Sequence, residues 1–169
     1  MDHLEIARQL KINAKVYKGL FTDLNEEEYL WREEDNKWSL LEVLCHLRDE
    51  ELEDWQTRTK FILDEIEGDP PPIHPEAWVK ERNYQSENFL LALEEFLKRR
   101  NQSIQWLETV QEPNWTLAYE HPKLGVQSAR LFLENWLAHD YLHIRQINKI
   151  KYNYLKKDAR ESLSYAGEW

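Results

Sequence analysis

Two histidines of one predicted helix, His139 and His143, have the spacing that lets two side chains bind the same metal ion. Residues four apart on a helix lie about 40° apart around its axis and about 5.4 Å apart along it. Both also follow the apolar spacing of their segment, because Trp136 lies three residues before His139 and Ile147 lies four after His143. The pair is therefore expected to face the interior, although an isolated pair of this kind occurs on many helices that bind no metal.

A third histidine, His46, is predicted on the inward face of another helix, three residues after Val43 and next to Leu47. Three buried imidazoles are costly unless hydrogen bonds or a metal satisfy them. Three histidines leave one metal position open, as catalytic zinc sites do, and water in that position ionises near neutral pH. Imidazole binds zinc, nickel, iron and copper alike. We predict a divalent metal site, with zinc or nickel as the expected ion, on His46, His139 and His143.

Three further residues are predicted near this metal from their spacing. Glu50 lies one helical turn after His46 and is expected to be catalytic as a general base, or to orient a ligand. The alternative for Glu50 is a solvated charge, because it belongs to a run of charged residues. Asn135, one turn before His139, and Trp38, at the start of the His46 helix, are expected to bind the substrate.

Other residues of these segments are expected to be structural or superficial. Asp140 and Cys45 each lie about 100° around the helix from a predicted ligand. We therefore expect Asp140 at the surface or in an interface, and Cys45 in the core rather than as a nucleophile. His74 and His121 each precede a proline in a predicted loop and are reserve ligands if one of the three fails. Trp136 is expected to form a wall of the pocket.

Four predicted helices supply these residues. Apolar residues recur at helical spacing over residues 3–21, from about 39 to 64, from about 84 to 111 and from about 128 to 152. Ser39 and Glu42 form a capping box at the start of the second helix, and Ser128 caps the fourth. The proline-rich residues 65–83 form a long crossover along the bundle, and residues 112–125 form a loop. Without convincing strand alternation, the predicted fold is an all-α four-helix bundle.

Composition limits the organisation and the partners of the chain. Its 169 residues are expected to form one domain, with a tail after Asp158 that packs on the bundle through Tyr165 and Trp169. The formal net charge of −10 disfavours binding to nucleic acid. Without a signal sequence or a run of about 20 apolar residues, we expect a cytoplasmic protein that does not enter the membrane. One cysteine excludes an internal disulfide, and the long aromatic-rich helices are compatible with a homodimer.

Two segments closely resemble the two signatures of the DinB-like superfamily. They are the opening of the second predicted helix, from Trp38 to Asp49, and the part of the fourth from Trp136 to Ile147. The order of the predicted helices matches as well, so the resemblance spans nearly the whole chain. It implies a bacterial protein with an up-down-down-up bundle and a divalent metal on one histidine of the second helix and two of the fourth. These positions correspond to His46, His139 and His143.

The resemblance also implies a reaction, because the superfamily includes bacillithiol S-transferases and related metal-dependent hydrolases. The leading hypothesis is a thiol S-transferase that joins a low-molecular-weight thiol to a small electrophile. The metal lowers the pKa of the thiol, and Glu50 or a metal-bound hydroxide accepts the proton. A hydrolase that activates water at the same ion is a close alternative. A non-enzymatic bundle that stores metal, senses stress or dimerises is the third.

Overall fold

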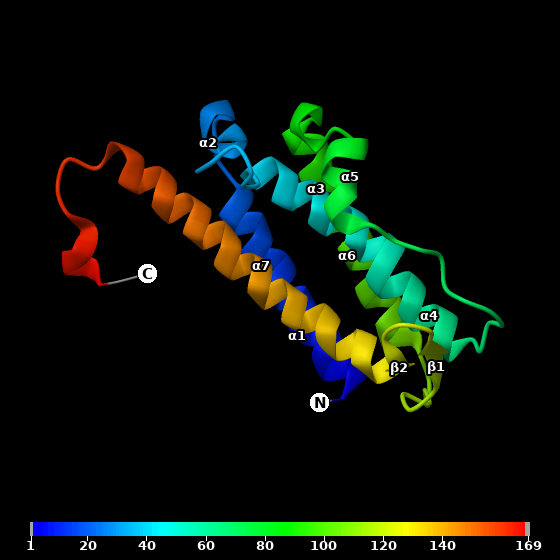
Figure 1. The fold of residues 1–169 in the computed structure, drawn as a ribbon. Coiled ribbons are helices and arrows are strands. Elements are labelled where there is room, and N and C mark those ends of the chain that lie inside the picture. The colour runs from blue at the N-terminus through cyan, green and yellow to red at the C-terminus, as the bar shows by residue number, and fades with distance from the viewer. Residues whose placement is uncertain (1, 168–169) are drawn as a thin grey trace.

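The computed structural model describes residues 2–167 and contains long helical segments that lie along one another (Figure 1). Helix α1 packs against α6 and α7, α3 packs against α6, and α4 packs against α7. The prediction of a mainly helical bundle is therefore confirmed. The long segments are α1 (His3–Phe21), α3 (Leu40–Glu50) continued by the π-helical η1 (Glu51–Gln56) and by α4 (Thr57–Leu63), α6 (Phe89–Thr109) and α7 (Ala129–Asp158).

Side-chain caps fix where three of these segments begin. Ser39 and Glu42 form the predicted capping box at α3, each accepting a hydrogen bond from the backbone N–H of the other. Ser128 caps α7 as predicted, and Asn88 caps α6; each accepts from the backbone N–H three residues later. These bonds satisfy donors that the first helical turn would otherwise leave free. Helix α6 accordingly begins at Phe89 and not near residue 84.

Shorter elements occupy the connections, and the sequence analysis predicted none of them. Helix α2 (Glu26–Leu30) follows α1, and α5 (Pro75–Glu81) with the 3₁₀ turn η2 (Tyr84–Ser86) lies in the crossover. The antiparallel hairpin of β1 (Ala118–His121) and β2 (Gly125–Ser128) corrects the expectation that residues 112–125 form a loop without strands. Neither strand alternates apolar with polar residues, which is the pattern that identifies a half-buried strand.

The C-terminal segment does not pack as predicted. After α7 the chain forms the 3₁₀ turn η3 (Leu163–Ala166), which extends away from the bundle in Figure 1. The exposed fraction of Tyr165 is 102%, so the prediction that Tyr165 anchors the tail is wrong. Trp169, the other predicted anchor, lies outside the described residues.

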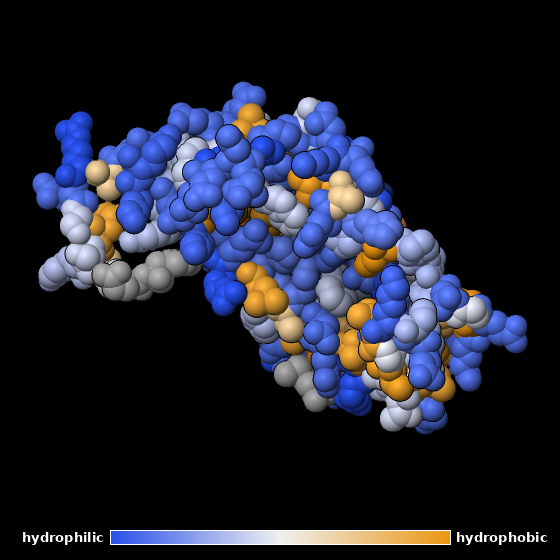
Figure 2. Space-filling model, viewed as in Figure 1, coloured by the Kyte–Doolittle hydropathy of each residue, from blue (hydrophilic) through white to orange (hydrophobic). Residues whose placement is uncertain are grey.

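The surface is largely hydrophilic on the face drawn in Figure 2, with hydrophobic residues gathered toward the hairpin end. Leu124 and Val126 are exposed there, on the turn and second strand of the hairpin. Within residues 2–167, no helix combines the length and apolar character required to cross a membrane.

The apolar core consists of two clusters separated by a layer of buried polar side chains. One cluster lies toward the end of α1 and the start of α3, around residues such as Phe21, Leu44 and Phe96. The other lies toward the start of α1 and along α4, around residues such as Leu10, Phe61 and Leu133. Between them, each long segment contributes a buried polar residue: Asn13, Glu51, Arg100 and Asp140.

Arg100 is the centre of this polar layer. Its Nη1 and Nη2 atoms donate to the two carboxylate oxygens of Asp140 at 2.7 and 2.8 Å, and Nη2 lies 2.8 Å from Glu51 Oε2. Asn13 Nδ2 donates to Asp140 at 3.0 Å, and Trp136 Nε1 donates to Glu51 at 3.0 Å. The expectation that Asp140 lies at the surface is therefore wrong, because a cation from another helix compensates its burial.

Replacing Arg100 with Ala leaves Glu51 and Asp140 buried without their cation. Removal of one partner of a buried ion pair costs about 3–5 kcal/mol, so we expect a loss of this size in the free energy of unfolding. Urea denaturation measures it. Arg8→Ala, which removes an exposed pair with Glu5 on α1, is the control and is expected to cost far less. Equal losses would contradict a stabilising role of the buried Arg100 cluster.

Candidate metal centre

The structure brings the three predicted metal ligands together at the polar layer. His46 comes from α3, and His139 and His143 come from α7. One ring nitrogen of each lies within 4.8 Å of those of the other two. The Nε2 atoms of His139 and His143 are 2.9 Å apart, and the His46 ring centroid lies 4.8 Å from that of His143. A single ion can therefore reach nitrogen donors from both helices.

Burial keeps these three imidazoles neutral. It lowers the pKa of His46 to about 2, that of His139 to about 4 and that of His143 to about 3. A neutral imidazole has a free nitrogen lone pair, which is the form that binds a metal. Within the described residues, the buried Nδ1 of His46 has no hydrogen-bond partner. Three neutral nitrogen donors fit a divalent ion such as zinc or nickel.

Glu50 lies directly beside these histidines. Its Oε2 atom is 2.8 Å from Nε2 of His139 and 3.5 Å from Nε2 of His46. Only 5% of Glu50 is exposed, which excludes the alternative of a solvated charge. Burial raises the pKa of this carboxyl group from 4.5 to about 7. Glu50 can therefore both accept and release a proton near neutral pH.

The π-helical segment η1 adds a residue to the site that the sequence analysis missed. A π turn places residues five apart above one another, in contrast to the four of an α-helix. Trp55 is five residues after Glu50, and its ring centroid lies 5.0 Å from that of His139. The α-helical spacing used for the sequence prediction does not place Trp55 on this face. Isolated π turns occur often at functional sites.

A cavity of about 680 Å³ opens beside the histidines and Glu50. Trp38 lines it, with its ring centroid 4.9 Å from that of His46, and so do residues 73–77 of the crossover. The placement of Trp38 agrees with its predicted contact with substrate, which stays a prediction. His74 also lines this cavity.

Two residues that were predicted at the pocket lie elsewhere. Asn135 is exposed, and its amide donates to the carbonyl of Leu131 within α7. It is not among the described residues that line the cavity, so its predicted role in substrate binding is unsupported. Trp136 is fully buried beside Glu51 and is likewise absent from the described residues that line the cavity. Both residues lie nearer the start of α7 than the ligands do.

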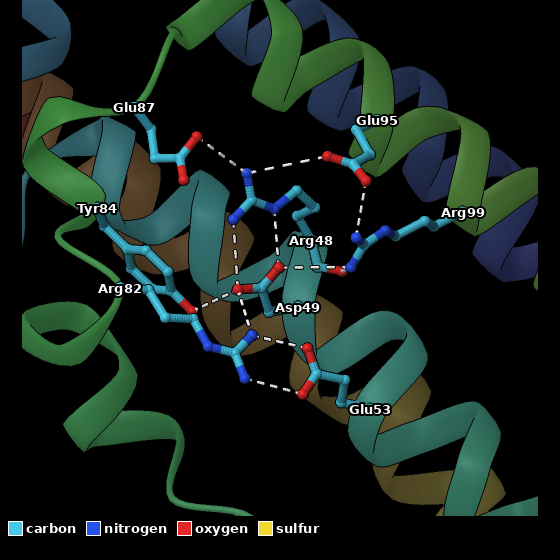
Figure 3. Close-up of polar contacts among 8 residues, drawn as sticks. All are labelled: Arg48, Asp49, Glu53, Arg82, Tyr84, Glu87, Glu95 and Arg99. Atoms are coloured by element: carbon cyan, nitrogen blue, oxygen red, sulfur yellow. Dashed lines mark hydrogen bonds and ion pairs between the residues drawn. The ribbon is translucent and has the colours of Figure 1, made fainter.

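A network of ion pairs holds the crossover against α3, as Figure 3 shows. Its centre is the buried Asp49, next to Glu50 in the sequence. Asp49 accepts hydrogen bonds from side chains of α3, the crossover and α6: Arg48, Arg82, Tyr84 and Arg99. Arg82 also pairs with Glu53 at 2.6 Å. These bonds fix the chain that follows α5 and thereby the crossover wall of the cavity.

Replacement of any one ligand histidine tests the metal site. His46→Ala, His139→Ala and His143→Ala each remove one of three clustered donors, so we expect loss of tight zinc binding in competition with a chromophoric chelator. The control is His121→Ala. Its Nδ1 accepts from two backbone N–H groups of the hairpin turn, so zinc binding should stay unchanged. Equal weakening in the control would place the ion elsewhere.

The raised pKa of Glu50 predicts a pH-dependent change in stability without metal. The folded protein holds this proton more tightly than the unfolded chain, so the stabilisation is present below pH 4.5 and is lost as the pH rises through about 7. Glu50→Gln is neutral throughout. We expect the metal-free variant to exceed the original protein in stability by about 1–3 kcal/mol near pH ~8 and to differ little near pH ~5. Urea denaturation giving the same difference at both pH values would contradict the shift.

Comparison with known proteins agrees with this fold. A family model described as the DinB superfamily matches residues 9–147. YfiT from Bacillus subtilis, described as a probable metal-dependent hydrolase with an unusual four-helix bundle topology, has a similar structure with a TM-score of 0.77. The two sequences are 16% identical, and the match covers 89% of this chain and 86% of YfiT. A search of curated proteins gives no match. Because the family model matches most of the chain and includes all three histidines, this protein belongs to the DinB superfamily.

Proposed function

We propose that this protein is a metal-dependent enzyme that acts on a small molecule, with its ion held by His46, His139 and His143. The observation that carries the proposal is the position of Glu50, a buried carboxyl group of raised pKa, against these neutral imidazoles and beside a cavity. A divalent ion at this position supplies Lewis acidity, which lowers the pKa of a water molecule or thiol that contacts it. The cavity of about 680 Å³ is within the usual size of small-molecule sites.

Glu50 is the proton acceptor in this proposal. In the chain without metal, burial raises the pKa of Glu50 to about 7, and a divalent ion beside it would favour the ionised form, which accepts a proton. Cys45 does not act as the nucleophile, because its thiol is buried in the core and burial raises its pKa to about 12. The sequence prediction that Cys45 is a core residue is confirmed. In this proposal the nucleophile is a thiol or a water molecule from solution.

The reaction that we propose is transfer of a low-molecular-weight thiol to a small electrophile, as the family resemblance implies. The thiol sulfur bonds to the electrophilic carbon, the leaving group departs with its bonding electrons, and Glu50 takes the thiol proton. Trp38 and Ile73 supply apolar surface for the electrophile. The same proposal includes zinc or nickel as the ion and a single domain over residues 1–169 with an up-down-down-up order of helices. It also includes a cytoplasmic location and a homodimer.

Hydrolysis is the second candidate reaction, and the description of YfiT as a probable metal-dependent hydrolase favours it. The same residues serve, with water as the nucleophile and Glu50 as the acceptor of its proton. Because Glu50 and the histidines have the same role in both reactions, substrate assays separate the two candidates.

Activity measurements with untagged, zinc- or nickel-loaded protein test the proposal. We expect conjugation of a small thiol to a model electrophile, loss of activity on chelation and recovery when divalent metal is restored. A panel of thiols is needed, together with ester and amide substrates. Hydrolysis without thiol transfer would replace the first reaction by the second. Absence of both activities in metal-loaded protein would contradict an enzyme and favour a non-enzymatic bundle.

Glu50→Gln separates catalysis from metal binding. The variant keeps the shape of the side chain but not its basicity, so we expect kcat to fall by about 10²–10⁴-fold while the zinc content stays at one ion per chain. Metal analysis and steady-state kinetics measure the two quantities. Glu108→Gln, which changes an exposed carboxylate of α6 that lies 3.7 Å from Lys11, is the matched control and should retain activity. An unchanged kcat in Glu50→Gln would remove Glu50 from the mechanism.

A further inference from the structure

A second cavity, of about 600 Å³, adjoins the cavity at the histidines. Trp38 and Glu76 line both cavities and form their common wall. The remaining walls of the second cavity come from the connection between α2 and α3 and from α5 with the turn after it. A ligand that passes Trp38 can therefore contact both cavities at once.

The two cavities differ in charge. Among the described residues that line the cavity at the histidines there is no lysine or arginine, whereas Glu50 and Glu76 are acidic. The second cavity has two exposed lysines, Lys37 from the α2–α3 connection and Lys80 from α5. Within the described chain, neither lysine has an ion-pair partner, and neither does Asp35, which also lines this cavity.

Two further charged residues that line the second cavity, Arg32 and Glu42, form an ion pair with each other. Arg32 donates to both carboxylate oxygens of Glu42, which also accepts from the backbone N–H of Ser39. Two cations and two carboxylates are left to meet a ligand, and they come from two separate segments of the chain: Lys37, Lys80, Asp35 and Glu76. Charges of both signs suit a ligand group that carries an ammonium and a carboxylate.

We propose that the second cavity binds the amino-acid end of a peptide-like cosubstrate whose reacting end lies at the three histidines. This inference rests on the proposed function for the position of the reacting end. Lys37 and Lys80 bind the carboxylate, and Asp35 and Glu76 bind the ammonium. The cavity at the histidines has no lysine or arginine among its described lining residues to compete for the carboxylate, so the charge distribution orients the ligand.

Binding of S-methylglutathione to metal-free protein tests this proposal without the reaction. The probe has ammonium and carboxylate groups but no thiol, so the result does not depend on catalysis or on the metal. Indole ¹H–¹⁵N signals provide the readout, with the Trp38 signal assigned from Trp38→Phe. We expect the probe to shift the Trp38 signal. Its diethyl ester, which lacks both carboxylates, should bind about tenfold more weakly.

The double variant Lys37→Met and Lys80→Met identifies the residues responsible. It is expected to raise the Kd for S-methylglutathione about tenfold and to leave the Kd for the diethyl ester unchanged. Lys123→Met, on the exposed turn of the hairpin, is the charge-matched control and should leave both unchanged. Equal affinity for acid and ester, no binding of either, or an unaffected double variant would overturn the subsite. Activity lost while this binding pattern persists would refute the proposed function instead.

Discussion

The rest of the structure depends on the ion pairs that the buried guanidinium of Arg100 makes with two carboxylates. This guanidinium joins Glu51 of the second long segment to Asp140 of α7, and both carboxylates lie in the polar layer between the two apolar clusters. Removing these charges from water is costly unless they are paired. The ion pairs form only when each helix has the rotation about its axis and the position along its axis that bring the charged groups together. Asn13 adds a bond from α1 to the same carboxylate of Asp140. The cluster therefore fixes the register of the whole bundle.

This register also orients the metal site, because the residues that contact Arg100 are neighbours of the residues that contact the ion. Glu51 follows Glu50, and Asp140 follows His139. When Arg100 holds Glu51 and Asp140 on one side of their helices, the preceding residue of each projects toward the other helix. Glu50 and His139 then meet at 2.8 Å. From the same turn of α3, the ion pairs of Asp49 extend toward the crossover, where Arg82 donates to it.

Burial favours the neutral form of the titratable groups at this site, so it lowers the pKa values of the three histidines and raises that of Glu50. It keeps the three histidines neutral, which suits metal binding, and it raises the pKa of Glu50 to about 7, which suits proton transfer. Among residues 2–167, the buried His46 Nδ1 has no hydrogen-bond partner. Unsatisfied polar groups in a core cost stability. The layer thus gives up some stability of the bundle for a site with prepared ligands and base.

The sequence by itself determined the features that depend on spacing within one helix. The capping box of Ser39 and Glu42, the inward stripes and the shared face of His139 and His143 follow from local sequence spacing, and the core position of Cys45 follows in the same way. The inward position of His46 on a second helix predicted that it joins the other two histidines, and the family signatures agreed with that prediction. Contacts between helices were decided only by the tertiary structure, since spacing does not tell which cation meets which carboxylate. Asp140 was misplaced at the surface because its partner, Arg100, is 40 residues away in the sequence. Trp55 was missed because η1 follows a π period, and Asn135, one turn from a ligand, is not among the described residues that line the cavity. Local periodicity fixes directions around a single helix axis, whereas the position of a cavity depends on how several axes pack.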